Sequence, residues 1–153
     1  MVKVFVVYDT KYGNTKLVAE KVVEGMRKIE GIETAVSDVK EVDFERVADY
    51  DAILIGAPTH FGAPSRTITK FIDKLGKVDL KAKWAAVFDT YLKTDFEKGV
   101  KPMEARINEK VPGLKLIVPG LSIRVNEMEG PIAEGELPKC IDFAKRIATQ
   151  FKT

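Results

Sequence analysis

The stretch from Val2 to Met26 reads VKVFVVYDTKYGNTKLVAEKVVEGM. It begins with a nearly continuous apolar run, Val2–Tyr8, which is typical of a strand buried on both faces of a parallel sheet. A short polar loop with one glycine follows. From residue 15 to residue 29, apolar side chains then recur at helical spacing, which predicts a helix with one buried face. A strand, a tight loop and a helix in this order predict the first unit of an alternating α/β fold.

The rest of the chain repeats this alternation. Apolar runs predict strands at 33–39, 51–57 and 83–88, and a fifth strand at 114–118 and 121–125 that is interrupted by Pro119 and Gly120. Helical periodicity predicts helices at 64–75, 102–111 and 138–151, with Gly76 placed to end the first of them. We therefore predict a single domain over residues 1–153, a three-layer, doubly wound α/β fold. Its parallel sheet should have five strands.

The composition excludes several classes of function. The chain has 153 residues, 45% of them hydrophobic and 31% charged, with a net charge of +2. This charge is too small to predict nucleic-acid binding, and no apolar run is long enough to span a membrane. We expect a soluble cytoplasmic protein. Cys140, the single cysteine, falls on the apolar face of the last predicted helix, so we expect it to pack in the core. His60 is the single histidine and cannot build a histidine-rich metal site.

In doubly wound sheets, ligands bind beyond the carboxyl ends of the strands, so the loops at 9–15, 58–64 and 89–101 are the candidates. The first loop offers the side chains of Thr10, Asn14 and Thr15. Its backbone amides open a helix, where they have no intrahelical partner and favour an anion such as phosphate. Gly13 would let the backbone approach that anion closely. The alternative is that Asn14 or Thr15 only caps the helix.

The second loop, GAPTHFGAPS at residues 56–65, places two flat rings, His60 and Phe61, next to the first loop. The third loop begins DTYLK at residue 89, and its Tyr91 is another aromatic residue at a strand end. Rings beside a phosphate cradle predict a planar ligand that carries a phosphate. The alternatives are that Phe61 packs in the core and that His60 is a solvated loop histidine. Neither the GxxxxGK[ST] nor the GxGxxG phosphate motif is present.

YDTKYGNT at residues 8–15, GAPTHFG at residues 56–62 and the position of Tyr91 resemble flavodoxins, which bind flavin mononucleotide (FMN). The resemblance covers the whole chain in order, and it implies the flavodoxin-like strand order 2-1-3-4-5 for the five-stranded sheet. The first loop is similar to the flavodoxin pattern [ST]-x-[ST]-G-x-[ST], although Lys11 and Tyr12 stand where many members have other residues. The tail, GELPKCIDFAKRIA from residue 135, resembles the flavodoxin domains of flavodiiron proteins. PTHFG instead resembles flavin-dependent NAD(P)H:quinone oxidoreductases.

The resemblance implies an FMN site built from three segments. The phosphate would be bound by Thr10, Lys11, Tyr12, Gly13, Asn14 and Thr15. The isoalloxazine would be lined by Pro58, Thr59, His60, Phe61 and Gly62. Thr90, Tyr91 and Leu92 would form the third loop, with Tyr91 stacked on the ring. Lys93 stands where flavodiiron-type domains have an aromatic residue, so the outer wall of the ring site departs from their pattern.

Three functions are compatible with the predicted fold, and the first two also use the FMN site. The first is an electron carrier that shuttles electrons between redox partner proteins and has no substrate of its own. Basic side chains outnumber acidic ones in and after the three loops, which favours an acidic partner. The second is an FMN-dependent NAD(P)H:quinone oxidoreductase with His60 as proton donor. The third is a phosphoacceptor receiver domain, which shares the topology but would need acidic residues at the ends of strands one and three.

Overall fold

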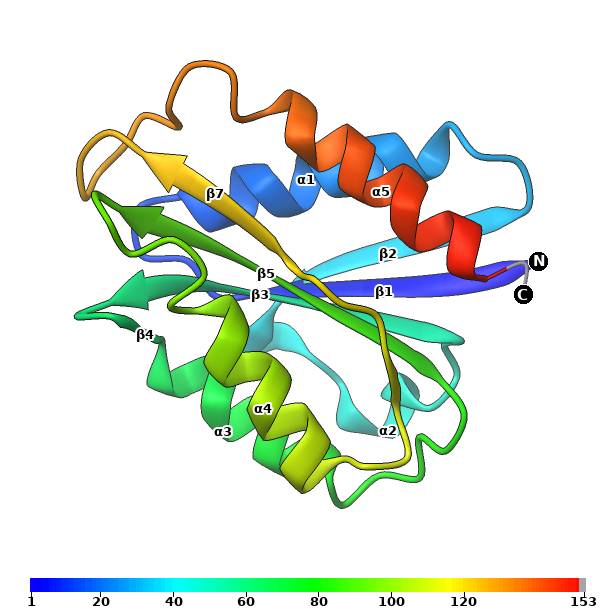
Figure 1. Cartoon of the computed structure of the whole chain (residues 1–153). Coiled ribbons are helices and arrows are strands. Elements are labelled where there is room, and N and C mark those ends of the chain that lie inside the picture. Colours follow the sequence, from blue (N-terminus) through cyan, green and yellow to red (C-terminus); the bar gives the residue numbers. More distant parts are fainter. Residues whose placement is uncertain (152–153) are drawn as a thin grey trace.

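The computed structural model describes residues 1–151, which form a sheet with helices on both sides (Figure 1). The predicted strand–helix alternation is confirmed. The strands are β1 (Val2–Tyr8), β2 (Ile32–Asp38), β3 (Ala52–His60), β4 (Ala63–Pro64), β5 (Trp84–Leu92), β6 (Lys115–Leu116) and β7 (Leu121–Val125). The helices are α1 (Asn14–Arg27), the 3-10 turn η1 (Val39–Glu41), α2 (Phe44–Val47), α3 (Arg66–Leu75), α4 (Val100–Lys110) and α5 (Pro138–Gln150).

The sheet has the predicted order. β2, β1, β3 and β5 lie side by side in that sequence and pair in parallel. β6 and β7 both pair in parallel with β5, so together they are the predicted fifth strand, divided at Pro119 and Gly120. The carboxyl ends of β3, β5 and β7 therefore meet at one edge of the sheet, on the left in Figure 1.

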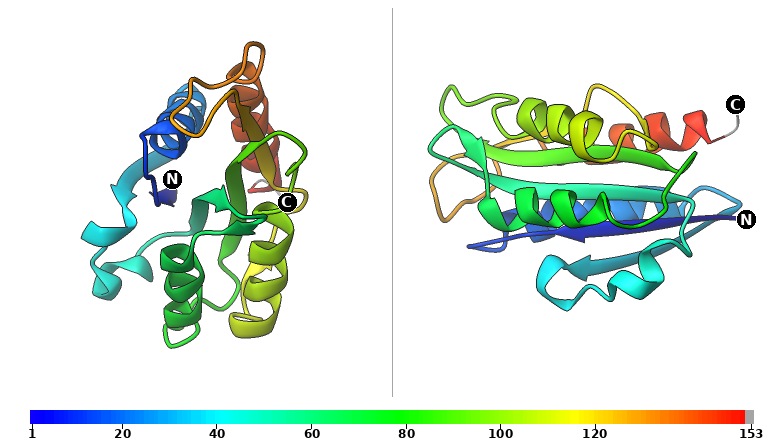
Figure 2. Two further views of the ribbon diagram at one scale, coloured as in Figure 1. Left: turned by 90° about the vertical axis from the view of Figure 1, so that its left-hand side faces the viewer. Right: turned by 90° about the horizontal axis from the view of Figure 1, so that it is seen from below.

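Helices cover both faces of the sheet, as the two further views show (Figure 2). α1 and α5 pack on one face, over side chains such as Val6, Leu54 and Phe88. α3 and α4 pack on the other face, over Ile53 and Ile55. This division follows from the alternation of side chains along each strand. Cys140 is buried without exposed surface, as predicted, and burial raises the pKa of its thiol to about 12.

Two strands run further than predicted. β3 was expected to end at residue 57 and β5 at residue 88, but they end at His60 and Leu92. The added part of β5 pairs with β7, and the end of β3 pairs with β4 in an antiparallel hairpin. The β5 extension depends on β7, a partner distant in the sequence, whereas β4 follows β3 directly in the chain. The short elements β4, η1 and α2 were not predicted. The prediction of one domain over 1–153 stays a prediction.

Across residues 1–151, no helix is both long and apolar enough to cross a membrane. The cytoplasmic location stays a prediction.

Candidate functional site

A cavity of about 360 Å³ lies at the carboxyl edge of the sheet, where the sequence predicted a ligand site. Such a volume falls within the range of ordinary small-molecule sites. All predicted site residues line it except Gly13 and Gly62. Its lining is Thr10, Lys11, Tyr12, Asn14, Thr15, Pro58, Thr59, His60, Phe61, Thr90, Tyr91, Leu92, Lys93, Thr94, Asp95, Val125 and Met128.

The first loop holds an open helix N-terminus toward this cavity. Gly13 is the N-cap residue of α1, with φ of 92°, and no side chain of the described structure caps the helix. The alternative that Asn14 or Thr15 serves as the cap is therefore wrong. The first amides of α1 have no intrahelical acceptor, and the first turn contains no acidic residue. The Gly13 amide donates to Thr10 Oγ1 at 2.9 Å, which holds the loop in its turn. This end of the cavity suits an anion.

Three threonines with buried hydroxyl groups belong to the cavity lining. Thr15 Oγ1 and Thr90 Oγ1 are 2.9 Å apart and buried, so they share one hydrogen bond between the first loop and β5. Thr59 Oγ1 is also buried and has no hydrogen-bond partner within residues 1–151. A buried hydroxyl without a partner costs free energy. A polar ligand in the cavity would remove that cost.

Two aromatic side chains line the cavity in different ways. Phe61 is fully exposed, with φ of 51°, next to Gly62 with φ of 74°. The alternative that Phe61 packs in the core is therefore wrong. Tyr91 is 9% exposed and meets the ring of Phe96 edge-on, with 5.7 Å between the centroids. Desolvation by burial raises the pKa of Tyr91.

Two details of the predicted loops are wrong. Thr90, Tyr91 and Leu92 are not a loop but the last residues of β5, because β7 continues the ladder beside them. His60 is likewise not a solvated loop histidine: it is half-buried and belongs to β3, paired with Ala63. The loop proper begins at Lys93, whose φ is 56°. Strand pairing therefore holds the backbone of both segments at the cavity wall.

Five further lining residues were not among the predicted FMN contacts, although Lys93 was expected near the outer wall of the ring site. Lys93, Thr94 and Asp95 follow directly after the predicted third segment. The other two are Val125, the last residue of β7, and Met128, which lies in the segment between β7 and α5. Met128 Sδ accepts a hydrogen bond from the Tyr12 hydroxyl at 3.6 Å, which joins this segment to the first loop. The signal for it was available, because the fifth strand ends at the same sheet edge as the others.

The charge at the cavity is less basic than the sequence count indicated. Lys74, one of the basic residues after the second loop, does not line the cavity, and its Nζ lies 4.3 Å from the ring centroid of Phe44 in α2. Lys98 is paired with Asp95 at 3.3 Å. Lys11 and Lys93 remain as exposed cations in the cavity lining.

The residues present fit FMN. Amides and hydroxyls for a phosphate and a sugar chain lie at one end, and flat rings lie on the walls formed by β3 and β5. The family model for the flavodoxin domain matches residues 5–120.

The chain belongs to the flavodoxin family.

A flavodoxin from Aquifex aeolicus is 41% identical over 86 residues, which are 53% of this chain and 46% of that protein. The match thus spans less than half the length of this relative. A flavodoxin from the domain Archaea has a TM-score of 0.84 at 23% identity, covering 99% of this chain and 100% of its own. Flavodoxin 2 from Bacillus cereus has a TM-score of 0.82 at 27% identity, covering 97% of this chain and 99% of its own.

The expected likeness to flavodiiron proteins also appears. The flavodiiron core of Flv1 from Synechocystis sp. has a TM-score of 0.77 at 16% identity, over 99% of this chain and 36% of that longer chain. At this identity the likeness shows the fold alone. The family assignment leaves the receiver-domain alternative without support.

Proposed function

We propose that this flavodoxin-family protein binds FMN and carries electrons between redox partner proteins. The observation that supports this most directly is the uncapped N-terminus of α1 at one end of a cavity that also contains Phe61 and Tyr91. An open set of amides selects a phosphate, and the rings select a flat ligand. Bound FMN would supply the redox chemistry, and the protein would bind and orient it.

Each segment has a proposed role. The amides of the first loop and the hydroxyls of Thr10 and Thr15 would hold the phosphate. Thr59 and Thr90 would bind the sugar chain, since both line the cavity and carry buried hydroxyls. Tyr91 would stack on the flavin from the β5 side. Phe61 would cover the other face, since it lines the cavity and is free of core contacts.

The cavity mouth supports electron transfer to another protein. Phe61, Met128 and Tyr12 all line the cavity and are exposed apolar or aromatic side chains. Lys11 and Lys93 add positive charge to the same lining, so we propose an acidic partner. Encounter with such a partner should slow as salt rises, because exposed charges are screened.

Equilibrium titration with FMN, riboflavin and flavin adenine dinucleotide tests the cofactor. FMN should bind most tightly, because riboflavin lacks the phosphate and the dinucleotide carries a second phosphate for which the first loop offers no further helix N-terminus. Equal affinity for FMN and riboflavin would show that the α1 amides contribute nothing.

Steady-state turnover of NAD(P)H with a quinone separates a carrier from the quinone reductase that PTHFG resembles. A carrier should show no turnover above that of free FMN. If the wild type turns over quinone and His60→Gln lowers the rate by about 10²–10⁴-fold, His60 acts as a general acid and the carrier proposal is wrong. Flavin affinity of the variant, measured in parallel, controls for damage to the site.

A further inference from the structure

Asp89 lies in β5, directly before the cavity residue Thr90, and is completely buried. Its Oδ2 accepts hydrogen bonds from the amides of Gly99, at 3.1 Å, and Val100, at 2.9 Å. These residues are the N-cap and the first residue of α4, and Gly99 has no side chain with which to cap the helix. A carboxylate from the neighbouring strand therefore takes the place of a local cap. The partial positive charge of the helix N-terminus offsets part of the cost of burying this carboxylate.

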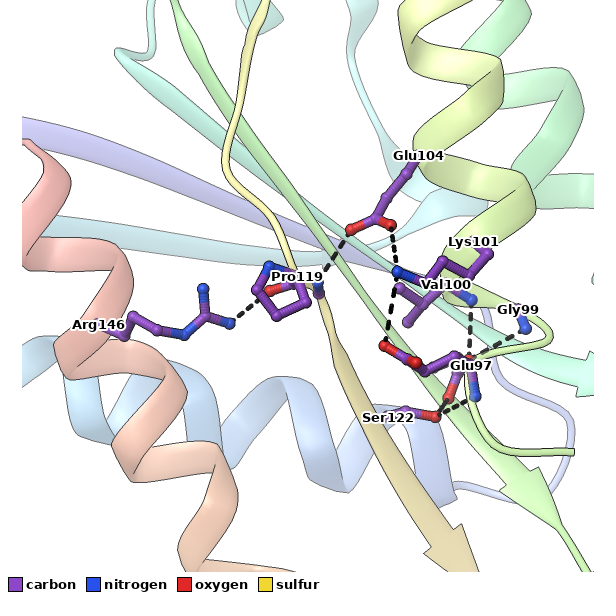
Figure 3. Close-up of polar contacts among 10 residues, drawn as sticks. Glu97, Gly99, Val100, Lys101, Glu104, Pro119, Ser122 and Arg146 are labelled. Carbon is purple, nitrogen blue, oxygen red and sulfur yellow. Dashed lines mark hydrogen bonds and ion pairs between the residues drawn. The ribbon is translucent and has the colours of Figure 1, made fainter. Parts of the chain in front are cut away.

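The other carboxylate oxygen of Asp89 contacts the loop before α4 through Ser122. Oδ1 accepts the Ser122 hydroxyl at 2.6 Å. Ser122 Oγ in turn accepts the Glu97 amide at 3.0 Å, as Figure 3 shows for the labelled residues. Asp89 thus holds the chain at Glu97, Gly99 and Val100, directly or through one hydroxyl.

Ser122 lies in β7, two residues after Gly120, and hydrogen bonds hold the chain in place at the break between β6 and β7. The Gly120 amide donates to Glu104 Oε2 at 2.9 Å, and Arg146 of α5 donates to the carbonyl of Pro119 (Figure 3). Lys101 Nζ lies 4.0 Å from both Glu97 and Glu104. The network therefore joins β7, α4 and α5 to the loop that follows β5.

This loop is a wall of the cavity. Its residues Lys93, Thr94 and Asp95 line the cavity and lie between the end of β5 and the residues that Asp89 holds. A Cβ added to Gly99 would come 2.9 Å from Asp89 Oδ2 and 2.7 Å from Thr59 Oγ1, so Gly99 separates the carboxylate from a cavity hydroxyl. Asp89 lies one residue layer below the site and does not line it.

We propose that Asp89 is a positioning residue, which sets the third wall of the flavin site by accepting hydrogen bonds from Gly99, Val100 and Ser122. The proposal rests on the proposed function where it concerns flavin. What matters in this proposal is an acceptor oxygen at the position of Asp89 Oδ2. Asparagine can present one oxygen to the Gly99 and Val100 amides, so Asp89→Asn should keep the wall in place. Alanine should not, because it leaves two amide donors without a buried acceptor.

The experiment uses Asp89→Ala, Asp89→Asn and Ser122→Ala, with Ser65→Ala as the matched control. Ser65 also carries a buried hydroxyl, but this hydroxyl has no hydrogen-bond partner in the described part of the chain and lies outside the cavity lining. Two quantities are measured: FMN affinity, and amide hydrogen exchange of Glu97, Gly99 and Val100 in the flavin-free protein. The second does not depend on flavin binding.

Asp89→Ala should weaken FMN binding by about tenfold or more and speed exchange at Gly99 and Val100 by at least as much. Asp89→Asn should restore both to within about threefold of the wild type. Ser122→Ala should speed exchange at Glu97, and it carries the test alone if Asp89→Ala does not fold. Ser65→Ala should change neither quantity.

Unchanged exchange in Asp89→Ala, or an Asp89→Asn variant as impaired as Asp89→Ala, would overturn the proposal. If the wild type binds no FMN, the proposed function is wrong, and the exchange rates still decide whether Asp89 positions the wall.

Discussion

Thr15 and Thr90 share a buried hydrogen bond, with 2.9 Å between their hydroxyl oxygens, although 75 residues separate them in the chain. Thr15 lies in the first turn of α1, and Thr90 lies near the end of β5. The bond joins the proposed phosphate end of the cavity to the strand that carries Tyr91. Each hydroxyl can change its partner when a ligand enters, because a hydroxyl both donates and accepts.

Thr15→Val removes the hydroxyl and keeps the β-branched shape. We expect FMN affinity to fall by roughly 1–3 kcal/mol, because a hydrogen bond to a charged phosphate is lost. Riboflavin affinity should change far less, since riboflavin has no phosphate. Calorimetric titration of both ligands measures the difference. Thr69→Val in α3, whose hydroxyl donates to the Arg66 carbonyl, is the matched control and should leave both affinities unchanged.

Gly13→Ala and Gly31→Ala form a second matched pair. Both glycines have positive φ, 92° and 87°, and an added Cβ would meet no described atom within 4 Å at either one. Each substitution should lower the free energy of unfolding by about 1–2 kcal/mol, because a non-glycine residue is strained there. Only Gly13→Ala should weaken FMN binding as well. Urea unfolding and FMN titration of both variants check this, and equal FMN affinities would contradict it.

Gly56 allows the ring of Phe88 to lie against the β3 backbone. A Cβ added to Gly56 would come 2.0 Å from Cε2 of Phe88, whose side chain is fully buried. Gly56→Ala should therefore destabilise the fold by about 1–3 kcal/mol or more through overpacking. Phe88→Leu in the same chain should recover part of that loss. Urea unfolding of the two single variants and the double variant gives the coupling energy, and additive effects would argue against the contact.

The stability of the wild type should depend on pH through Asp89. Desolvation by burial raises the pKa of Asp89 from 3.8 to about 6 in the folded state, against the lowering by its hydrogen bonds to Ser122, Val100 and Gly99. The favourable contribution of the neutral carboxyl is complete below pH 3.8 and is lost as the pH rises through about 6.

Asp89→Asn cannot ionise, so its stability relative to the wild type should increase between pH 4 and pH 8, by up to about 3 kcal/mol for this difference in pKa. Urea unfolding of both proteins at several pH values in this range measures the increase. A stability difference that is the same at every pH would show that Asp89 does not titrate in this way.

The sequence by itself determined the strand–helix alternation and pointed to the carboxyl edge of the sheet as the place for a ligand site. These depend on local signals: the periodicity of apolar side chains, and turn residues such as Gly13 and Pro119. The free amides at the N-terminus of α1 could be predicted for the same reason, because the first loop and this helix are adjacent in the chain.

Only the tertiary structure decided which residues complete the site. The extension of β5 through Leu92 depends on pairing with β7, and Met128 reaches the cavity because β7 ends beside β5. Asp89 is hydrogen-bonded by Ser122, which lies 33 residues further along the chain. Its raised pKa follows from the loss of water around it. Burial, strand pairing and hydrogen-bond partners depend on contacts between residues that are distant in the sequence. A local sequence pattern cannot predict such contacts.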